Sequence, residues 1–145
     1  MAKSTSTRTK PPSLGRALIV EDDALLAMNL EDALLAGGAE AVVVCDTVSA
    51  AMAELEKLKP DILILDVQLA DRDDGWAMAE LVTALSPRPP AIIFSTGAPE
   101  RIPERVSQLG AVLVKPYDPA ALIALLVDVR RKPGLLGRLR EALAG

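Results

Sequence analysis

From residue 17 onward the chain alternates between short, almost continuous apolar runs and longer segments in which apolar residues recur every three or four positions. Runs of this kind, rich in valine and isoleucine, are typical of strands that are buried on both faces of a sheet. The pattern therefore predicts five strands: ALIV (17–20), AVVVC (41–45), DILILD (61–66), AIIFS (91–95) and AVLV (111–114).

The longer segments have the periodicity of amphipathic helices, with apolar side chains gathered on one face. Four helices are predicted, over residues 23–36, 47–58, 74–85 and 119–131. Gly37-Gly38 is a stop signal for the first of them. Asp46 or Thr47 is expected to cap the second and Asp118 the last, because their side-chain oxygens can accept hydrogen bonds from the first backbone N–H groups.

The crossover before the last predicted strand, APERIPERVSQLG (98–110), has a different character. Pro99 and Pro103 interrupt helical hydrogen bonding, so that only about two turns fit, over residues 103–109. A further helix is therefore expected here, the fourth in chain order, and we expect it to be short or mobile. Five apolar strands that alternate with helices predict one α/β domain, with a doubly wound, five-stranded parallel sheet covered on both faces.

The two ends of the chain depart from this pattern. Residues 1–15 are basic, rich in serine and threonine and free of acidic residues, and we expect a disordered arm there rather than a transit peptide. Residues 16–131 make up the predicted domain, and no second domain is expected after it. Residues 132–145 are a basic tail in which LLGRLREALAG has the spacing of a short amphipathic helix that could cap the domain or meet a partner.

Charge is unevenly distributed along the 145 residues. Residues 17–129 carry 7 basic and 19 acidic side chains, a net −12, whereas residues 1–16 and 130–145 carry +4 each. An acidic body is a poor surface for nucleic acid, so we expect no such partner, but it suits a divalent cation where carboxylates converge. No apolar run is long enough to span a membrane and no secretory signal is recognisable, so a cytoplasmic location is expected.

Histidine is absent and Cys45 is the single cysteine, which excludes histidine-based catalysis, histidine-rich or cysteine-rich metal sites and intrachain disulfides. Polar side chains nevertheless follow four of the predicted strands, at the carboxyl ends where doubly wound sheets form their sites. These groups are Glu21-Asp22-Asp23, Asp66, Ser95-Thr96-Gly97 and Lys115-Pro116. Each alone fits a helix cap, a turn or an exposed lysine, but their conjunction at one edge predicts a functional site.

The chemistry of this set is that of phosphoryl transfer. Clustered carboxylates without histidine or cysteine select a hard ion, and we expect Mg²⁺. A carboxylate beside Mg²⁺ can act as a nucleophile toward a phosphoryl group and form an aspartyl-phosphate. Transfer requires neutralisation of the phosphoryl oxygens, to which the Lys115 ammonium and a hydrogen bond from the Thr96 hydroxyl would contribute.

Four segments, ALIVEDD, DILILDVQL, AIIFSTG and VLVKPY, occur in an order and spacing that resemble the receiver domain of two-component response regulators. The resemblance covers roughly residues 16–130 and implies a flavodoxin-like fold. It implies that Asp66 accepts the phosphoryl group, that Thr96 is a hydroxyl switch and that Lys115 pairs with the phosphate.

The same resemblance implies a Mg²⁺ site and a cis peptide bond between Lys115 and Pro116. The metal ligands it implies are the side chains of Glu21, Asp22 and Asp66 and the backbone carbonyl of Gln68. Asp23 is given no ligand role. The chain departs from the family in two places: the loop over residues 70–75 is one residue longer than usual, and Val112 stands where an aromatic residue is usual, which argues against an aromatic switch.

The string FSTG, the proline-broken fourth helix and the string KPY resemble a subgroup of stand-alone receivers from alphaproteobacteria that carry a Phe-Ala-Thr-Gly-like motif. That resemblance implies a sensor histidine kinase partner in a stress or envelope-signalling pathway. We therefore predict a single-domain response regulator, a monomer or weak dimer, that accepts a phosphoryl group on Asp66 from a histidine kinase or a histidine phosphotransfer protein. It would signal by binding a downstream protein or by phosphorelay.

We expect a phosphoryl acceptor with no enzymatic activity beyond self-dephosphorylation. This self-dephosphorylation is expected to be slow, because the Ala98 side chain cannot orient a water molecule. Two alternatives stay open. An aspartyl-phosphate phosphatase would place a second acid two residues after the nucleophile, where this chain has Gln68. A receiver-like binding module would keep the fold but leave the acceptor inert, which the complete set of polar residues argues against.

Overall fold

The computed structural model describes residues 13–68 and 75–131, and within them it contains a five-stranded sheet in the order β2-β1-β3-β4-β5. Every neighbouring pair of strands is parallel. The strands are β1 (Gly15–Val20), β2 (Ala39–Cys45), β3 (Ile62–Asp66), β4 (Ala91–Thr96) and β5 (Ala111–Val114). The predicted five-stranded parallel sheet is confirmed, and each strand begins and ends within two residues of its prediction.

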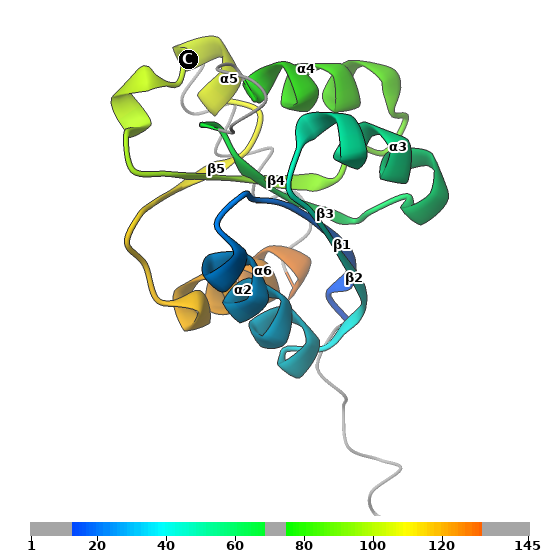
Figure 1. The fold of residues 1–145 in the computed structure, drawn as a ribbon. Helices are drawn as coiled ribbons and strands as arrows, with labels where there is room; N and C mark the ends of the chain where they lie inside the picture. Colours follow the sequence, from blue (N-terminus) through cyan, green and yellow to red (C-terminus); the bar gives the residue numbers. More distant parts are fainter. Residues whose placement is uncertain (1–12, 69–74, 132–145) are drawn as a thin grey trace, which may run out of the picture.

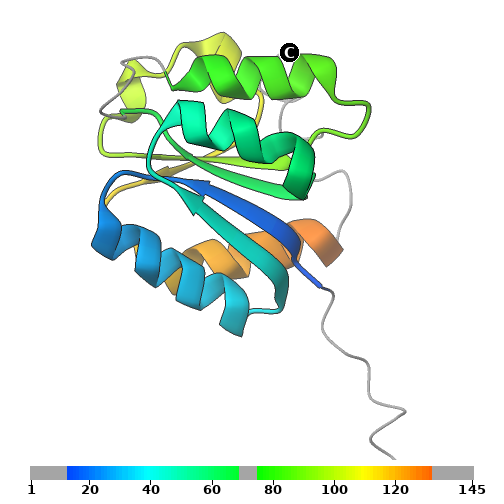
Figure 2. The ribbon, with the colours of Figure 1, turned by 45° about the vertical axis from the view of Figure 1, so that its right-hand side comes forward.

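Helices cover both faces of the sheet, which confirms the doubly wound arrangement (Figure 1). They are α2 (Ala24–Ala36), α3 (Val48–Leu58), α4 (Trp76–Leu85), α5 (Glu104–Ser107) and α6 (Pro119–Arg131), with a 3₁₀ turn η1 (Pro99–Arg101). Helices α2 and α6 lie against one face and α3, α4 and α5 against the other (Figure 2).

The almost continuous apolar strands follow from this arrangement, because alternate side chains of a strand enter opposite layers. In β1, Leu18 and Val20 are buried under α3 and α4, whereas Ala17 and Ile19 are buried under α2 and α6. Both layers are covered over the central strands β1, β3 and β4, so polar residues of these strands are displaced to their ends. Phe94 is the one aromatic side chain among the fully buried residues of the described chain, and the rest of that core is aliphatic.

The sheet begins earlier along the chain than the hydrophobic pattern predicts. Gly15 has a φ of +76°, a conformation that favours glycine, and a Cβ at this position would collide with the Asp61 carboxylate. The backbone of Arg16 forms two hydrogen bonds with Asp61, from its N–H to Oδ2 (2.9 Å) and from the Asp61 N–H to its carbonyl (2.8 Å). A long-range contact therefore adds two residues to β1.

The helix ends largely follow the sequence signals. Thr47 rather than Asp46 caps α3, since its Oγ1 accepts a hydrogen bond from the Ala50 N–H at 3.0 Å. Asp118 accepts from the Ala120 N–H at 2.9 Å, as predicted for the start of α6. The predicted helix over 74–85 starts at Trp76 in the structure.

The crossover before β5 is short, as predicted: it contains only the 3₁₀ turn η1 and the four-residue helix α5. Two side chains, Ile102 and Val106, enter the core beneath it with 7% and 0% exposure, so the segment is fixed by few apolar contacts. A segment with so small a buried area is suited to rearrangement.

The predicted arm (1–15) and tail (132–145), and the predicted longer loop at residues 70–75, lie largely or wholly outside the described residues. Within residues 13–68 and 75–131, no helix has the length and apolar character needed to cross a membrane.

Candidate functional site

The carboxyl edge of the sheet brings the predicted polar groups together. Glu21 follows β1, Asp66 ends β3, Thr96 ends β4 and Lys115 follows β5. Strands β1, β3 and β4 are neighbours in the sheet, so the first three groups stand in a row. Glu21, Asp66 and Thr96 are almost fully buried, with 2%, 4% and 0% exposure. Polar groups at this depth require partners, and for the two carboxylates Lys115 is one of them.

Lys115 joins the two buried carboxylates. Its Nζ lies 2.9 Å from Glu21 Oε1 and 3.4 Å from Asp66 Oδ2. These contacts span 94 and 49 residues along the chain, so only the folded sheet creates them. The site therefore holds two buried carboxylates against one ammonium.

Burial is the main reason why the pKa of Glu21 rises to about 7. The neighbouring Asp66 carboxyl raises it further, whereas hydrogen bonds from Lys115 and from the Asp23 N–H (3.1 Å) lower it. Burial also lowers the pKa of Lys115, but its hydrogen bond to Glu21 and the charge of Asp66 outweigh this effect and leave that pKa raised. Lys115 therefore carries a positive charge at neutral pH. This single ammonium does not balance the negative charge that the carboxylates carry when they are ionised.

An all-oxygen donor set is present at this point. Glu21, Asp22 and Asp66 each offer a carboxylate oxygen, and these atoms all lie within 4.8 Å of one another. Asp66 is held in place by the Gln68 N–H, which donates to its Oδ1 at 2.9 Å. Carboxylate oxygens at this spacing, with a deficit of positive charge, fit a hard divalent cation such as Mg²⁺. The ligand role of the Gln68 carbonyl stays a prediction.

Asp23 has a different role from its two neighbours: it is the N-cap of α2. Its Oδ1 accepts hydrogen bonds from the N–H groups of Leu25 and Leu26, at 3.0 and 3.1 Å. The acidic triplet therefore divides into two residues of the carboxylate cluster and one that caps the helix.

Replacing Asp23 by alanine is expected to lower the free energy of unfolding by about 1 kcal/mol, because two helical N–H groups lose their acceptor. The matched variant Asp23→Ser keeps a capping oxygen and should lose less than half of that amount. Mg²⁺ affinity should stay within about twofold of wild type in both variants, because the Asp23 N–H that supports Glu21 is retained. Urea unfolding and Mg²⁺ titration measure the two quantities, and a large loss of affinity would assign Asp23 to the metal site.

Thr96 and Lys115 are linked through the backbone as well as through the site. The Lys115 N–H donates to the Thr96 carbonyl at 2.7 Å, and the Thr96 hydroxyl accepts from the Ala98 N–H at 2.9 Å. The peptide bond between Lys115 and Pro116 is cis, as predicted.

One polar pair beside this site was not predicted from the sequence. Ser95 Oγ and the Tyr117 hydroxyl are 2.9 Å apart, and Ser95 has no solvent exposure. The only signal was indirect: a serine in an otherwise apolar run, and a tyrosine two residues after the lysine, both in a chain with few aromatics.

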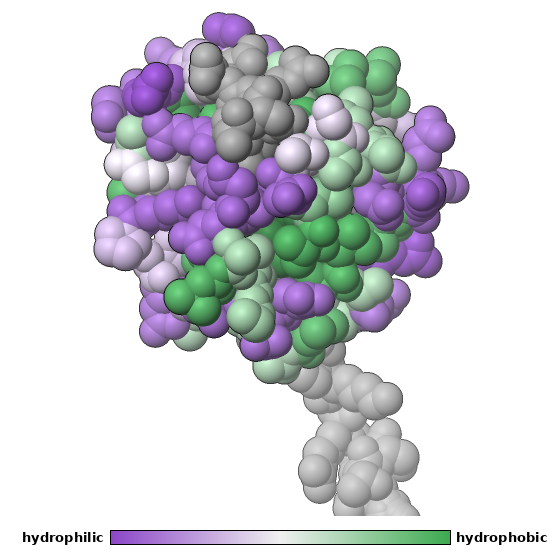
Figure 3. Space-filling model, in the orientation of Figure 1, coloured by the Kyte–Doolittle hydropathy of each residue, from purple (hydrophilic) through white to green (hydrophobic). Residues whose placement is uncertain are grey.

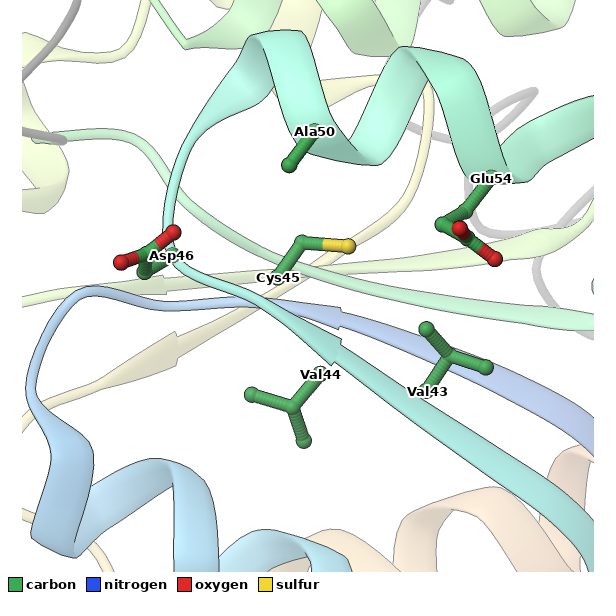
Figure 4. A pocket seen from close by; sticks show the side chains of 6 residues that line it. All are labelled: Val43, Val44, Cys45, Asp46, Ala50 and Glu54. Atoms are coloured by element: carbon green, nitrogen blue, oxygen red, sulfur yellow. The ribbon is translucent and has the colours of Figure 1, made fainter.

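A shallow hollow elsewhere in the structure belongs to a different surface. It lies between β2 and α3, and none of the site residues line it (Figure 4). Its lining residues are Val43, Val44, Cys45, Asp46, Ala50 and Glu54. Burial, followed by the charges of Glu54 and Asp46, raises the pKa of the Cys45 thiol and favours its neutral form.

A family model described as the response regulator receiver domain matches residues 17–127. The chain belongs to this family. The resemblance identified from the sequence, and with it the flavodoxin-like fold, is confirmed. The chain is therefore a receiver domain of the two-component signalling systems.

Relatives of several kinds share this receiver domain. A sensory transduction protein LytT from Bacillus anthracis is 30% identical over 132 residues, which cover 88% of this chain and 52% of LytT. The chemotaxis protein CheY from Thermotoga maritima is 26% identical, over 80% of this chain and 98% of CheY. A CheY-like receiver structure from Methylobacillus flagellatus superimposes with a TM-score of 0.70 at 25% identity, over 81% and 99% of the two chains. The chain thus spans about half the length of LytT and nearly all of CheY.

Proposed function

We propose that this receiver domain accepts a phosphoryl group on Asp66 from a histidine kinase or a histidine phosphotransfer protein. The observation that carries the proposal is the position of the Asp66 carboxylate. It lies at the centre of the edge, with Oδ1 held by the Gln68 N–H and Oδ2 facing the Lys115 ammonium. A buried carboxylate that is fixed in orientation and faces a cation is prepared for attack on phosphorus.

The transfer step can be written with the residues of this chain. The Asp66 carboxylate attacks the phosphorus, a P–O bond forms, and the P–N bond to the donor's imidazole breaks with its electron pair returning to nitrogen. Lys115 Nζ, 3.4 Å from Asp66 Oδ2, would pair with the phosphoryl oxygens. The Thr96 hydroxyl would donate a hydrogen bond to another of these oxygens.

Mg²⁺ is proposed as the cofactor, held by Glu21, Asp22, Asp66 and the Gln68 carbonyl. When bound, it would supply the positive charge that the three carboxylates lack and would neutralise the phosphoryl oxygens. The fit rests on the donor set: three carboxylate oxygens within 4.8 Å of one another, two of them on buried residues.

The output would be a change in protein binding, controlled from Thr96. Its hydroxyl now accepts from the Ala98 N–H, at the start of the lightly packed η1–α5 segment. A Thr96 hydroxyl that turns toward a phosphoryl oxygen would weaken this contact and shift the segment. A partner that contacts residues 97–109 would then bind the two states with different affinities.

The phosphodonor protein would meet an apolar surface beside the site. Helix α2 starts directly after the acidic triplet, and its Leu25 and Met28 side chains are 65% and 53% exposed. Hydrophobic side chains lie across this face of the molecule, over α2 and β2 (Figure 3). Exposed apolar area of this kind favours a protein partner. A signalling role in the cytoplasm, as in the alphaproteobacterial subgroup that the FSTG and KPY strings resemble, is part of the same proposal.

Incubation of the chain with Mg²⁺ and the small phosphodonor acetyl phosphate is expected to add one phosphate, measured by intact mass spectrometry. The adduct should be released by hydroxylamine, because it is an acyl phosphate, and chelation of Mg²⁺ by EDTA should prevent its formation. An unchanged mass, both with acetyl phosphate and with a phosphorylated histidine phosphotransfer protein, would contradict the proposal.

A further inference from the structure

The loop that carries Lys115 is attached to β4 at two points, one on each side of the lysine's side chain. Before it, the Lys115 N–H donates to the Thr96 carbonyl at 2.7 Å. After it, the Tyr117 hydroxyl lies 2.9 Å from Ser95 Oγ. Ser95 is the residue of β4 that pairs in register with Asp66 of β3. The second attachment therefore ties the lysine loop to the strand position next to the phosphoryl acceptor.

The second attachment is partly sheltered from water. Ser95 is fully buried, and the Tyr117 ring packs against the core layer formed with α2 and α6. Burial raises the pKa of the Tyr117 phenol, so the group is neutral and protonated at ordinary pH. A buried hydroxyl that loses its partner is costly, so this pair restricts the positions open to the loop.

We propose that the Ser95–Tyr117 hydrogen bond holds the lysine loop so that the Lys115 ammonium reaches Asp66, which makes Tyr117 a positioning residue for phosphoryl transfer. The inference rests on the proposed function and adds a residue to it.

Positioning matters because the Lys115 ammonium lies at unequal distances from the two carboxylates. Its Nζ is 2.9 Å from Glu21 but 3.4 Å from Asp66, so a small shift of the loop favours the first carboxylate over the second. The lysine side chain is 26% exposed and has a flexible four-carbon stem, so its own packing restrains it weakly. A fixed backbone on both sides supplies the missing restraint. Displacements of about 1 Å can change rates strongly in steps that depend on orientation.

The test uses three variants: Tyr117→Phe and Ser95→Ala, each of which removes one hydroxyl group, and the double variant, which removes both. Each single variant is expected to slow phosphate uptake about fivefold at saturating acetyl phosphate and Mg²⁺, the rate equivalent of about 1 kcal/mol for one hydrogen bond. The double variant should be no slower than the singles, because all three remove the same contact. Ser49→Ala, on the exposed side of α3, is the matched control and should react like wild type.

Measurement of Mg²⁺ affinity in each variant distinguishes a positioning role of Tyr117 from a general loosening of the site. Trp76, the only tryptophan, follows the Gly75 that lies against the Asp66 carbonyl, and its fluorescence can report Mg²⁺ binding. The affinity should be unchanged in all variants, since no carboxylate is altered. Variants that are less stable but take up phosphate at the wild-type rate would overturn the inference, and so would a parallel loss of rate and Mg²⁺ affinity.

A second readout does not depend on phosphorylation. The ¹H–¹⁵N correlation of the Lys115 ammonium should shift or broaden in Tyr117→Phe and Ser95→Ala, but not in Ser49→Ala. An unchanged signal would overturn the inference whatever the uptake rates are. If the signal shifts but wild type takes up no phosphate, the positioning stands and the proposed function fails.

Discussion

The variant Asp66→Asn is expected to take up no phosphate under conditions in which wild type takes up one per chain. The amide has almost the shape of the carboxylate but no anionic oxygen, so it cannot attack phosphorus. Its oxygen can still accept the hydrogen bond that the Gln68 N–H donates to Asp66 Oδ1 at 2.9 Å. The expected effect is therefore a complete loss of labelling in a folded protein.

The fold should tolerate this change well. In wild type, Asp66 and Glu21 are two buried carboxylates that share one ammonium, and Asp66 raises the pKa of Glu21. Removal of one negative charge leaves Lys115 with its closer partner, so the free energy of unfolding of Asp66→Asn should equal or exceed that of wild type without Mg²⁺.

The matched control for this variant is Asp46→Asn. Asp46 follows β2 at the same edge of the sheet, but it is exposed and lies outside the cluster of converging carboxylates. This variant should accept phosphate like wild type, as measured by intact mass and hydroxylamine release. Labelling of Asp66→Asn at the wild-type level would show that the acceptor is another carboxylate of the cluster.

The fold was predictable from sequence because its signals are local. Each strand is a compact apolar run that needs burial on both sides, and turn and cap residues such as Thr47 and Asp118 mark the boundaries between elements. The start of β1 was not predictable in this way. It depends on the contact between Gly15–Arg16 and Asp61, 45 residues away, which no local pattern contains.

The same distinction applies to the site. Residue type and strand-end position were enough to predict that Glu21, Asp66 and Lys115 lie together at one edge of the sheet. They did not reveal that Lys115 is closer to Glu21 than to Asp66, nor that Ser95 and Tyr117 form a pair. The pairing of Ser95 depends on side-chain direction: along β4, Ser95 and Thr96 point to opposite faces, so the Ser95 hydroxyl meets Tyr117 whereas the Thr96 hydroxyl meets the Ala98 N–H.

The electrostatics of Glu21 lead to the second large expected effect, a stability that depends on pH and Mg²⁺. The pKa of Glu21 is about 7 in the fold, against an ordinary value of 4.5. Between these two values the folded state holds a proton that the unfolded state has lost, so this residue makes the protein less stable as pH rises. The full contribution of Glu21 is at most about 3 kcal/mol and is reached above pH of about 7.

The variant Glu21→Gln isolates this contribution, because glutamine does not titrate while the other acidic residues remain. Relative to wild type, Glu21→Gln should gain about 2 kcal/mol in free energy of unfolding between about pH 5 and about pH 8, without Mg²⁺. Urea unfolding followed by the fluorescence of Trp76 measures the difference. The same difference at both pH values would contradict a raised pKa of Glu21.

Addition of Mg²⁺ should reverse the order of the two proteins at high pH. An ionised Glu21 is then a ligand rather than a buried excess charge, and wild type gains stability with ion concentration. Glu21→Gln should bind Mg²⁺ roughly 10-fold to 100-fold more weakly and gain correspondingly less. A residue that destabilises the empty site and stabilises the loaded one serves metal binding rather than folding. This is why a buried glutamate with a costly charge fits the proposed Mg²⁺ site.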